Sequence, residues 1–183
     1  LPALCNVVRR IALEAGEITL DYFEEGMMIA ADTKGDGSPV TEADRRAEEY
    51  IIRELKDTIA SIPVIGEETI AAGDVPDLSG EEYFWLVDPL DGTREFVAGS
   101  PDYTVNIALI KNHVPILGVI HAPARGEMFS AYGEGTAVRW LEETGSEKSI
   151  RTRIPPRGGL TVMASKTRSK EELDKFLEEH KVE

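Results

Sequence analysis

Short apolar runs separated by turn residues occupy most of the sequence after residue 61, and this pattern constrains the fold more than any other feature. The run at 103–110 alternates apolar residues such as Val105 with smaller or polar residues such as Thr104, which is typical of a strand with one buried face. Connections of only a few residues favour antiparallel neighbours. The sequence therefore predicts a largely antiparallel sheet with strands at 62–65, 83–87, 103–110, 114–121 and 127–132, and weaker candidates at 136–141, 148–154 and 160–164.

Two helical patterns precede these strands, and a third follows them. Residues 3 to about 25 place apolar side chains three or four apart, which predicts an amphipathic helix. Thr41 can cap a second helix with Asp44 in its first turn and Ile59 near its end, and a third helix is expected near 169–180. The intervening segment 33–40 concentrates glycine, proline and small polar residues, which predicts a mobile loop; with Asp36 it is expected to close over a site. Two N-terminal helices against such a sheet define an α+β layered unit.

The charge of the chain limits what it can bind. The 34 acidic and 20 basic residues give a net charge of −14, which opposes binding to a nucleic-acid polymer through a basic face. No apolar run approaches the roughly 20 residues of a membrane span, and the first residues lack a signal-peptide pattern. We expect a cytoplasmic protein, with peripheral association with the inner membrane as a further option. Cys5 cannot form an internal disulfide, since it is the sole cysteine, and is expected to be a small apolar residue on a helix.

The segment 85–96 carries the clearest chemical signal. An apolar strand ends in Asp88 and Asp91, and Pro89 between them lacks a backbone N–H, so the chain must turn there with the two carboxylates close together. No Lys or Arg lies between them, and a hard divalent metal would relieve their repulsion. The alternative is an Asp-Gly turn in which the Asp caps the next helix.

A second apolar strand also ends in acids, at Gly66-Glu67-Glu68. Gly92 and Thr93 follow the first acid pair and can open a helical turn whose N–H groups bind phosphate oxygens. Metal together with phosphate indicates phosphoryl chemistry. Asp44 is a further acid nearby, with a role at its own helix N-terminus as the alternative.

These residues resemble a known family. Gly66-Glu67-Glu68, Asp88-Pro89-Leu90-Asp91-Gly92-Thr93 with Phe96, and the segment 38–44 are similar to the motifs of the inositol monophosphatase superfamily, in the same order over about 1–165. Segments 93–96 and 104–109 look most like the bacterial 3'(2'),5'-bisphosphate nucleotidase branch. Arg94 and Glu95 could equally be a surface charge pair.

The resemblance implies a fold, a cofactor and a set of site residues. It implies the layered sandwich of the sugar phosphatases and two or three Mg²⁺ ions, with Mn²⁺ as an option, in a lithium-sensitive phosphate monoester hydrolase. Glu67, Asp88, Asp91 and the carbonyl of Leu90 would be metal ligands, and Glu68 an additional acid. Gly92, Thr93 and Asp91 would bind substrate; the catalytic residues would be Asp44, Thr93 and Glu67, the first two orienting the attacking water.

One feature of the family has no counterpart in this sequence. The family supplies a further metal-ligating Asp from a downstream Trp-Asp motif, whereas neither Trp85 nor Trp140 lies in a matching segment. We therefore expect a metal- and phosphate-binding domain over 1–165, the start of a C-terminal domain over 166–183, and a missing remainder of that smaller α/β domain. A homodimer is a further option.

Several alternatives remain open. Inositol phosphate or fructose 1,6-bisphosphate could replace adenosine 3',5'-bisphosphate as substrate, and a non-catalytic acidic metal- or partner-binding module is the rival from another class. His113, His121 and His180 lack ligand spacing and are expected to be structural. The basic group Arg151, Arg153 and Arg157 is expected to be solvated, with a substrate phosphate as the alternative.

Overall fold

The computed structural model describes residues 1–24, 31–33, 39–152 and 170–179. It divides the chain into two compact units, 1–150 and 151–183, which are described separately. In the second unit, α5 (Lys170–Glu179) confirms the predicted third helix. The expected domain boundary at 165 and the expected strand at 160–164 both lie outside the described residues.

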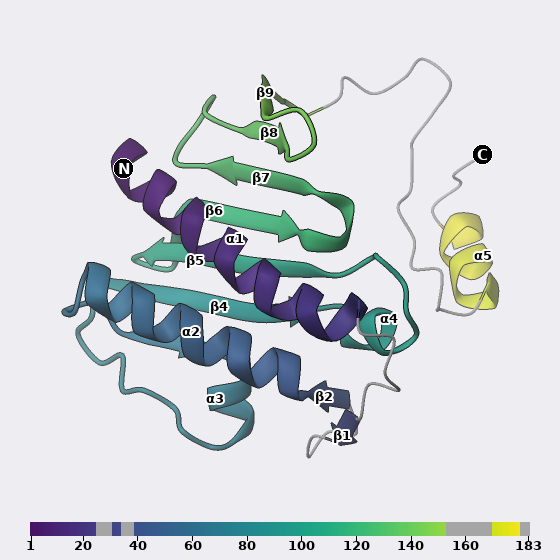
Figure 1. Ribbon diagram of the computed structural model, residues 1–183, viewed down its shortest axis with the longest axis horizontal. Helices are drawn as coiled ribbons and strands as arrows, with labels where there is room; N and C mark the ends of the chain where they lie inside the picture. Colours follow the sequence, from purple (N-terminus) through teal and green to yellow (C-terminus); the bar gives the residue numbers. More distant parts are fainter. Residues whose placement is uncertain (25–30, 34–38, 153–169, 180–183) are drawn as a thin grey trace. The chain divides into compact units, whose positions relative to one another are not determined.

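The first unit is built around a seven-stranded sheet with two long helices on one face (Figure 1). The helices are α1 (Pro2–Glu24) and α2 (Glu42–Thr58), and both cover the sheet from the same side, inclined to its strands. The strands follow one another in sequence order: β3 (Val64–Gly66), β4 (Tyr83–Asp91), β5 (Thr104–Lys111), β6 (Val114–Ala122), β7 (Glu127–Ala131), β8 (Val138–Leu141) and β9 (Ser146–Ser149). This arrangement confirms the predicted α+β layered unit.

The sheet is antiparallel except at one edge. Strands β4 to β9 pair antiparallel, whereas β3 runs parallel to β4 with Gly66 opposite Val87. The parallel pair is possible because residues 67–82, which include α3 (Glu67–Ala71), return the chain to the end of the sheet at which β3 begins, where β4 then starts. His113 lies in the β5–β6 turn with a φ of 65°.

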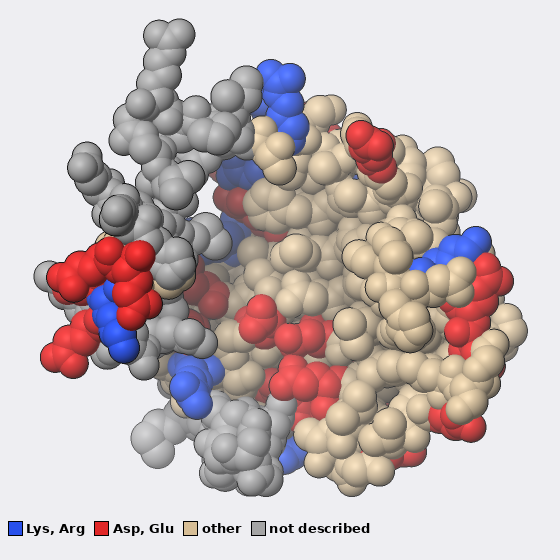
Figure 2. All heavy atoms as spheres, turned by 180° about the vertical axis from the view of Figure 1, so that it is seen from behind, with Lys and Arg blue, Asp and Glu red and all other residues tan. Residues whose placement is uncertain are grey.

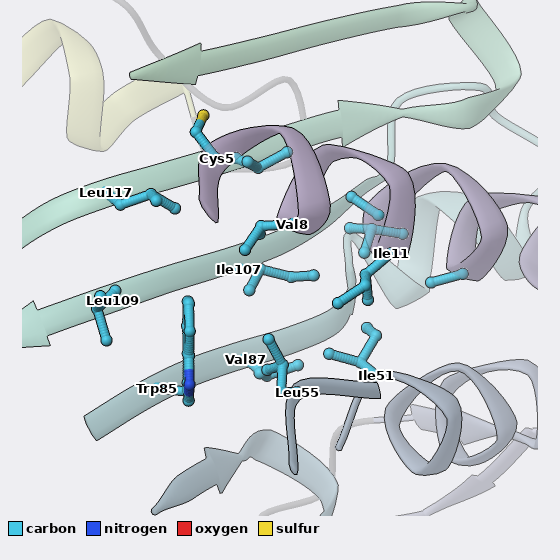
Figure 3. Close-up of a cluster of buried hydrophobic side chains, with 14 of the residues drawn as sticks. Cys5, Val8, Ile11, Ile51, Leu55, Trp85, Val87, Ile107, Leu109 and Leu117 are labelled. Atoms are coloured by element: carbon cyan, nitrogen blue, oxygen red, sulfur yellow. The ribbon is translucent and has the colours of Figure 1, made fainter. Parts of the chain in front are cut away.

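The core lies between the two helices and the sheet (Figure 3). Val8 and Ile11 of α1 and Ile51 of α2 pack against Trp85 of β4 and its neighbours on β5 and β6. Cys5 is buried in the same cluster, which fits its predicted role as a small apolar residue. The alternation along each central strand thus directs one side chain of every two toward the helices.

The opposite face of the sheet is open in this unit. Leu86 and Ile120 point away from the helices and are 47% and 48% exposed. Figure 2 views the molecule from this side and shows a surface made largely of uncharged residues, with acidic groups near its lower middle and at several places along its right-hand rim. In the described part of the chain, no helix combines the length and the apolar character that crossing a bilayer requires.

Some predicted boundaries were wrong at the edges of elements. Short strands β1 (Ala31–Thr33) and β2 (Pro39–Thr41) pair antiparallel, so both ends of the predicted loop 33–40 belong to a hairpin, and residues 34–38 lie outside the described chain. The predicted strand at 148–154 is observed as β9, ending at Ser149. Its residues are all exposed, and therefore gave a weak apolar signal.

Candidate active site

Two acid-bearing segments meet at the carboxyl ends of β3 and β4. Because β3 and β4 are parallel and in register at Gly66 and Val87, their carboxyl ends lie side by side. Glu67 follows β3 directly, and Asp88 occupies the next position of β4. The structure therefore brings the two predicted acid clusters together, through a parallel pair that the sequence did not predict.

The end of β4 is an irregular turn held by glycine. Pairing between β4 and β5 shifts between Asp88 and Asp91, where Pro89 removes a backbone donor. Gly92 has a φ of 99°, and a Cβ atom there would lie 2.8 Å from the carbonyl oxygen of Asp102. Only glycine suits both constraints, and it directs the chain into α4 (Thr93–Val97), which is anchored by the buried ring of Phe96.

Asp44 and Thr93 are in direct contact. The Thr93 hydroxyl lies 3.2 Å from Asp44 Oδ1 and 3.2 Å from the carbonyl oxygen of Leu90. Asp44 Oδ2 accepts hydrogen bonds from the backbone N–H and the hydroxyl of Thr41, at 2.9 and 2.5 Å. The first of these bonds, together with the Asp44 backbone N–H facing the Thr41 side chain, forms a capping box at the start of α2. Asp44 is only 1% exposed, and burial raises the pKa of its carboxyl above the usual range. The first turn of α2 is thus fixed to the turn after β4.

The remaining acids repel one another. Burial, the charge of Glu67, a hydrogen bond with Glu67 and the charge of Asp91 together raise the pKa of Asp88 to about 8. The backbone N–H of Leu90 donates to Asp88 Oδ1 at 3.2 Å and acts in the opposite direction. Asp88 therefore retains a proton near neutral pH unless a cation compensates the neighbouring charges.

This donor set fits a hard divalent metal in its chemistry. Glu67, Asp88, Asp91 and the Leu90 carbonyl offer only oxygen atoms, which suit Mg²⁺ or Mn²⁺. Within the described ranges, no three His, Cys, Asp or Glu side chains are already arranged as a metal cage. Asp88 Oδ1 accepts the Leu90 N–H at 3.2 Å, and the Leu90 carbonyl oxygen lies 3.2 Å from the Thr93 hydroxyl.

Glu48 is a buried acid beside the site that was not among the predicted site residues. This acid lies on α2 one turn after Asp44, and its carboxylate accepts hydrogen bonds from the backbone at Glu68 and Thr69. The sequence does contain a sign of its burial, because Glu48 lies four residues after Asp44 and therefore on the same face of the helix.

The other singled-out residues lie outside this arrangement. His121 is buried, its Nδ1 lies 2.9 Å from the carbonyl oxygen of Ala12, and burial lowers its pKa, so it is a neutral structural histidine as expected. Arg94 and Arg151 are exposed. His180, Arg153 and Arg157 lie outside the described residues.

Comparison with known proteins identifies the family to which this architecture belongs. Residues 3–180 match the model of the inositol monophosphatase family, and the chain belongs to that family. The 3'(2'),5'-bisphosphate nucleotidase CysQ of Escherichia coli O157:H7 is 38% identical over 181 residues, which is 96% of this chain and 69% of the relative.

Two further proteins are similar to this chain. A histidinol-phosphatase from Chlorobaculum parvum is 41% identical over 121 residues, covering 66% of this chain and 44% of its own. The crystal structure of CysQ from Bacteroides thetaiotaomicron superposes with a TM-score of 0.70 at 31% identity, covering 98% of this chain and 68% of that one. The predicted resemblance and fold class are confirmed.

Proposed function

We propose that this protein is a metal-dependent phosphatase that removes one phosphate from a 3'(2'),5'-bisphosphate nucleotide. The observation that carries the proposal is the Asp44–Thr93 contact, placed beside a sheet edge that collects Glu67, Asp88 and Asp91. A metal-binding module needs the carboxylates alone, and in it the contact between buried Asp44 and Thr93 would serve only to join α2 to the turn after β4. The pair therefore favours the enzyme over the non-catalytic module.

Each residue of the site has a distinct role in this proposal. Glu67, Asp88, Asp91 and the Leu90 carbonyl hold Mg²⁺, with Glu68 as an additional acid. When bound, the metal lowers the pKa of a water molecule and neutralises charge on the phosphate. The backbone N–H groups of Gly92 and Thr93 bind phosphate oxygens.

Thr93 and Asp44 orient the attacking water. Because the Thr93 hydroxyl donates a hydrogen bond to Asp44, its oxygen lone pairs are free to accept a hydrogen bond from that water. The water oxygen then forms a bond to phosphorus as the ester P–O bond breaks. The water gives up one proton and the leaving oxygen takes one up from solvent, so that the products are an alcohol and inorganic phosphate. No covalent phosphoenzyme is required.

The proposed substrate class is supported by the names of the relatives. The E. coli relative is named a 3'(2'),5'-bisphosphate nucleotidase, and segments 93–96 and 104–109 suggest the same branch. Histidinol phosphate is a second candidate because of the similarity to the Chlorobaculum enzyme over 121 residues. Inositol phosphate and fructose 1,6-bisphosphate are the alternatives within the family.

A phosphate-release panel tests the substrate class. The full-length protein is assayed with Mg²⁺ on adenosine 3',5'-bisphosphate, inositol 1-phosphate, fructose 1,6-bisphosphate and histidinol phosphate. We expect the highest kcat/KM for the nucleotide, with AMP and phosphate as products. A higher kcat/KM for any of the other three would overturn the nucleotide assignment, and no release from any of them would overturn the phosphatase.

The remaining parts of the proposal follow from the resemblance. We propose two or three Mg²⁺ ions, with Mn²⁺ as a substitute, inhibition by Li⁺, and a cytoplasmic enzyme. Residues 1–165 would form the metal- and phosphate-binding domain, and 166–183 would belong to a second domain that supplies a further Asp ligand. Monomer and homodimer are distinguished by analytical ultracentrifugation.

A further inference from the structure

Glu48 is a buried carboxylate that has no role in the proposed reaction. It is 3% exposed, and its side chain reaches from α2 to the start of α3. Its Oε2 accepts the backbone N–H of Glu68 at 2.7 Å, and its Oε1 accepts the backbone N–H and hydroxyl of Thr69 at 2.7 and 2.5 Å. A buried charge is costly unless it is hydrogen-bonded, and these three donors engage both oxygens.

The end of β3 is shaped to admit this carboxylate. A Cβ atom at Gly66 would lie 2.4 Å from Glu48 Cδ and 2.6 Å from each of its oxygens. A side chain at position 66 would therefore displace the carboxylate from the α3 turn. The Glu48 carboxylate thus occupies the space that a side chain at position 66, immediately before Glu67, would need.

The same face of α2 fixes both acid-bearing turns of the site. Asp44 and Glu48 are four residues apart and so project from one side of the helix. Asp44 contacts Thr93 in the turn after β4, whereas Glu48 contacts the turn after β3. One rigid helix thus determines how far the two turns lie from each other.

We propose that Glu48 is a positioning residue for the metal site. Its carboxylate fixes the first turn of α3, and thereby the place of Glu67 relative to Asp88 and Asp91. The inference rests on the proposed function for the role of Glu67 as a ligand. Outer residues that orient metal ligands commonly change metal affinity by about 10- to 100-fold when they are replaced.

Glu48→Gln in the full-length protein is the direct test. The Gln carbonyl can still accept a hydrogen bond, but its NH₂ group faces an N–H donor and cannot accept one. Glu49→Gln is the matched control, because it removes the same charge from the next, exposed position of α2. The readouts are Mg²⁺ affinity by calorimetry and amide hydrogen exchange of residues 67–71 without metal.

We expect the Mg²⁺ dissociation constant of Glu48→Gln to rise by about 10-fold or more, with faster exchange at Glu68 and Thr69. Glu49→Gln should match the wild type in both measurements. Ile51→Val controls for stability alone, since this buried core residue is not among the hydrogen-bond partners of α3. An equal loss of affinity in Ile51→Val would show a general effect of stability and overturn the positioning role.

Two further measurements keep the outcome decisive. If Glu48→Gln fails to fold, Thr69→Val removes only the hydroxyl donor, and we expect a several-fold weaker Mg²⁺ affinity; an unchanged affinity would refute the role. If Asp91→Asn abolishes Mg²⁺ binding while Glu48→Gln binds like the wild type, this inference alone fails. A wild-type protein that binds no Mg²⁺ would overturn both it and the proposed function.

Discussion

At the scale of single residues, the Thr93 hydroxyl links Asp44 to the turn after β4. Thr93→Val keeps the shape of the side chain but removes the group that contacts Asp44 and Leu90. We expect kcat to fall by about 10²-fold or more, the scale of a lost proton-handling or water-positioning group, with little change in Mg²⁺ affinity. Thr58→Val is the control, since that exposed hydroxyl bonds only the Glu54 carbonyl at 2.8 Å. Equal activity in both variants would remove Thr93 from the mechanism.

The acid cluster predicts an unusual dependence of stability on pH. The pKa of Asp88 is raised from 3.8 to about 8 in the folded protein, so between these values the folded state binds more protons than the unfolded state. The contribution of Asp88 to the free energy of unfolding therefore falls as pH rises from about 4 to about 8. Urea unfolding in EDTA at several pH values measures the slope, which should be shallower in Asp88→Asn. Identical slopes would contradict the electrostatic account of the site.

At the scale of elements, the turn into α4 depends on Gly92. Gly92 and Gly99 both have positive φ, at 99° and 73°, but only a Cβ at position 92 would meet another atom, the Asp102 carbonyl. Gly99→Ala should cost about 1–2 kcal/mol of stability through backbone strain alone. Gly92→Ala should cost more and should also lower turnover, because Thr93 must move with the turn. Equal losses by urea unfolding, with equal turnover, would show that the close approach to Asp102 is unimportant.

The elements also show what sequence patterns can and cannot predict. The alternation in β5 and the apolar spacing in α1 and α2 predicted the sheet and its helical layer, because burial of one face imposes those periods. The short helix α3 was missed, since five residues show no helical period. The partnership of Glu48 with Thr69 was missed for a related reason, because it depends on the parallel return of the chain to β4.

At the scale of the whole molecule, the proposed metal site lies where the carboxyl ends of β3 and β4 meet. Asp91→Asn removes one charge from that site while keeping nearly the same side-chain shape. The control is Asp77→Asn, a carboxylate that accepts the Ser79 N–H at 2.8 Å in an exposed segment.

The most direct measurement is the Mg²⁺ dependence of phosphate release from adenosine 3',5'-bisphosphate by the full-length protein. We predict activity that requires Mg²⁺, is lost in EDTA, and in Asp91→Asn is at least about 10²-fold lower or demands far more Mg²⁺. Asp77→Asn should match the wild type. Turnover and Mg²⁺ dependence unchanged by Asp91→Asn would contradict the account.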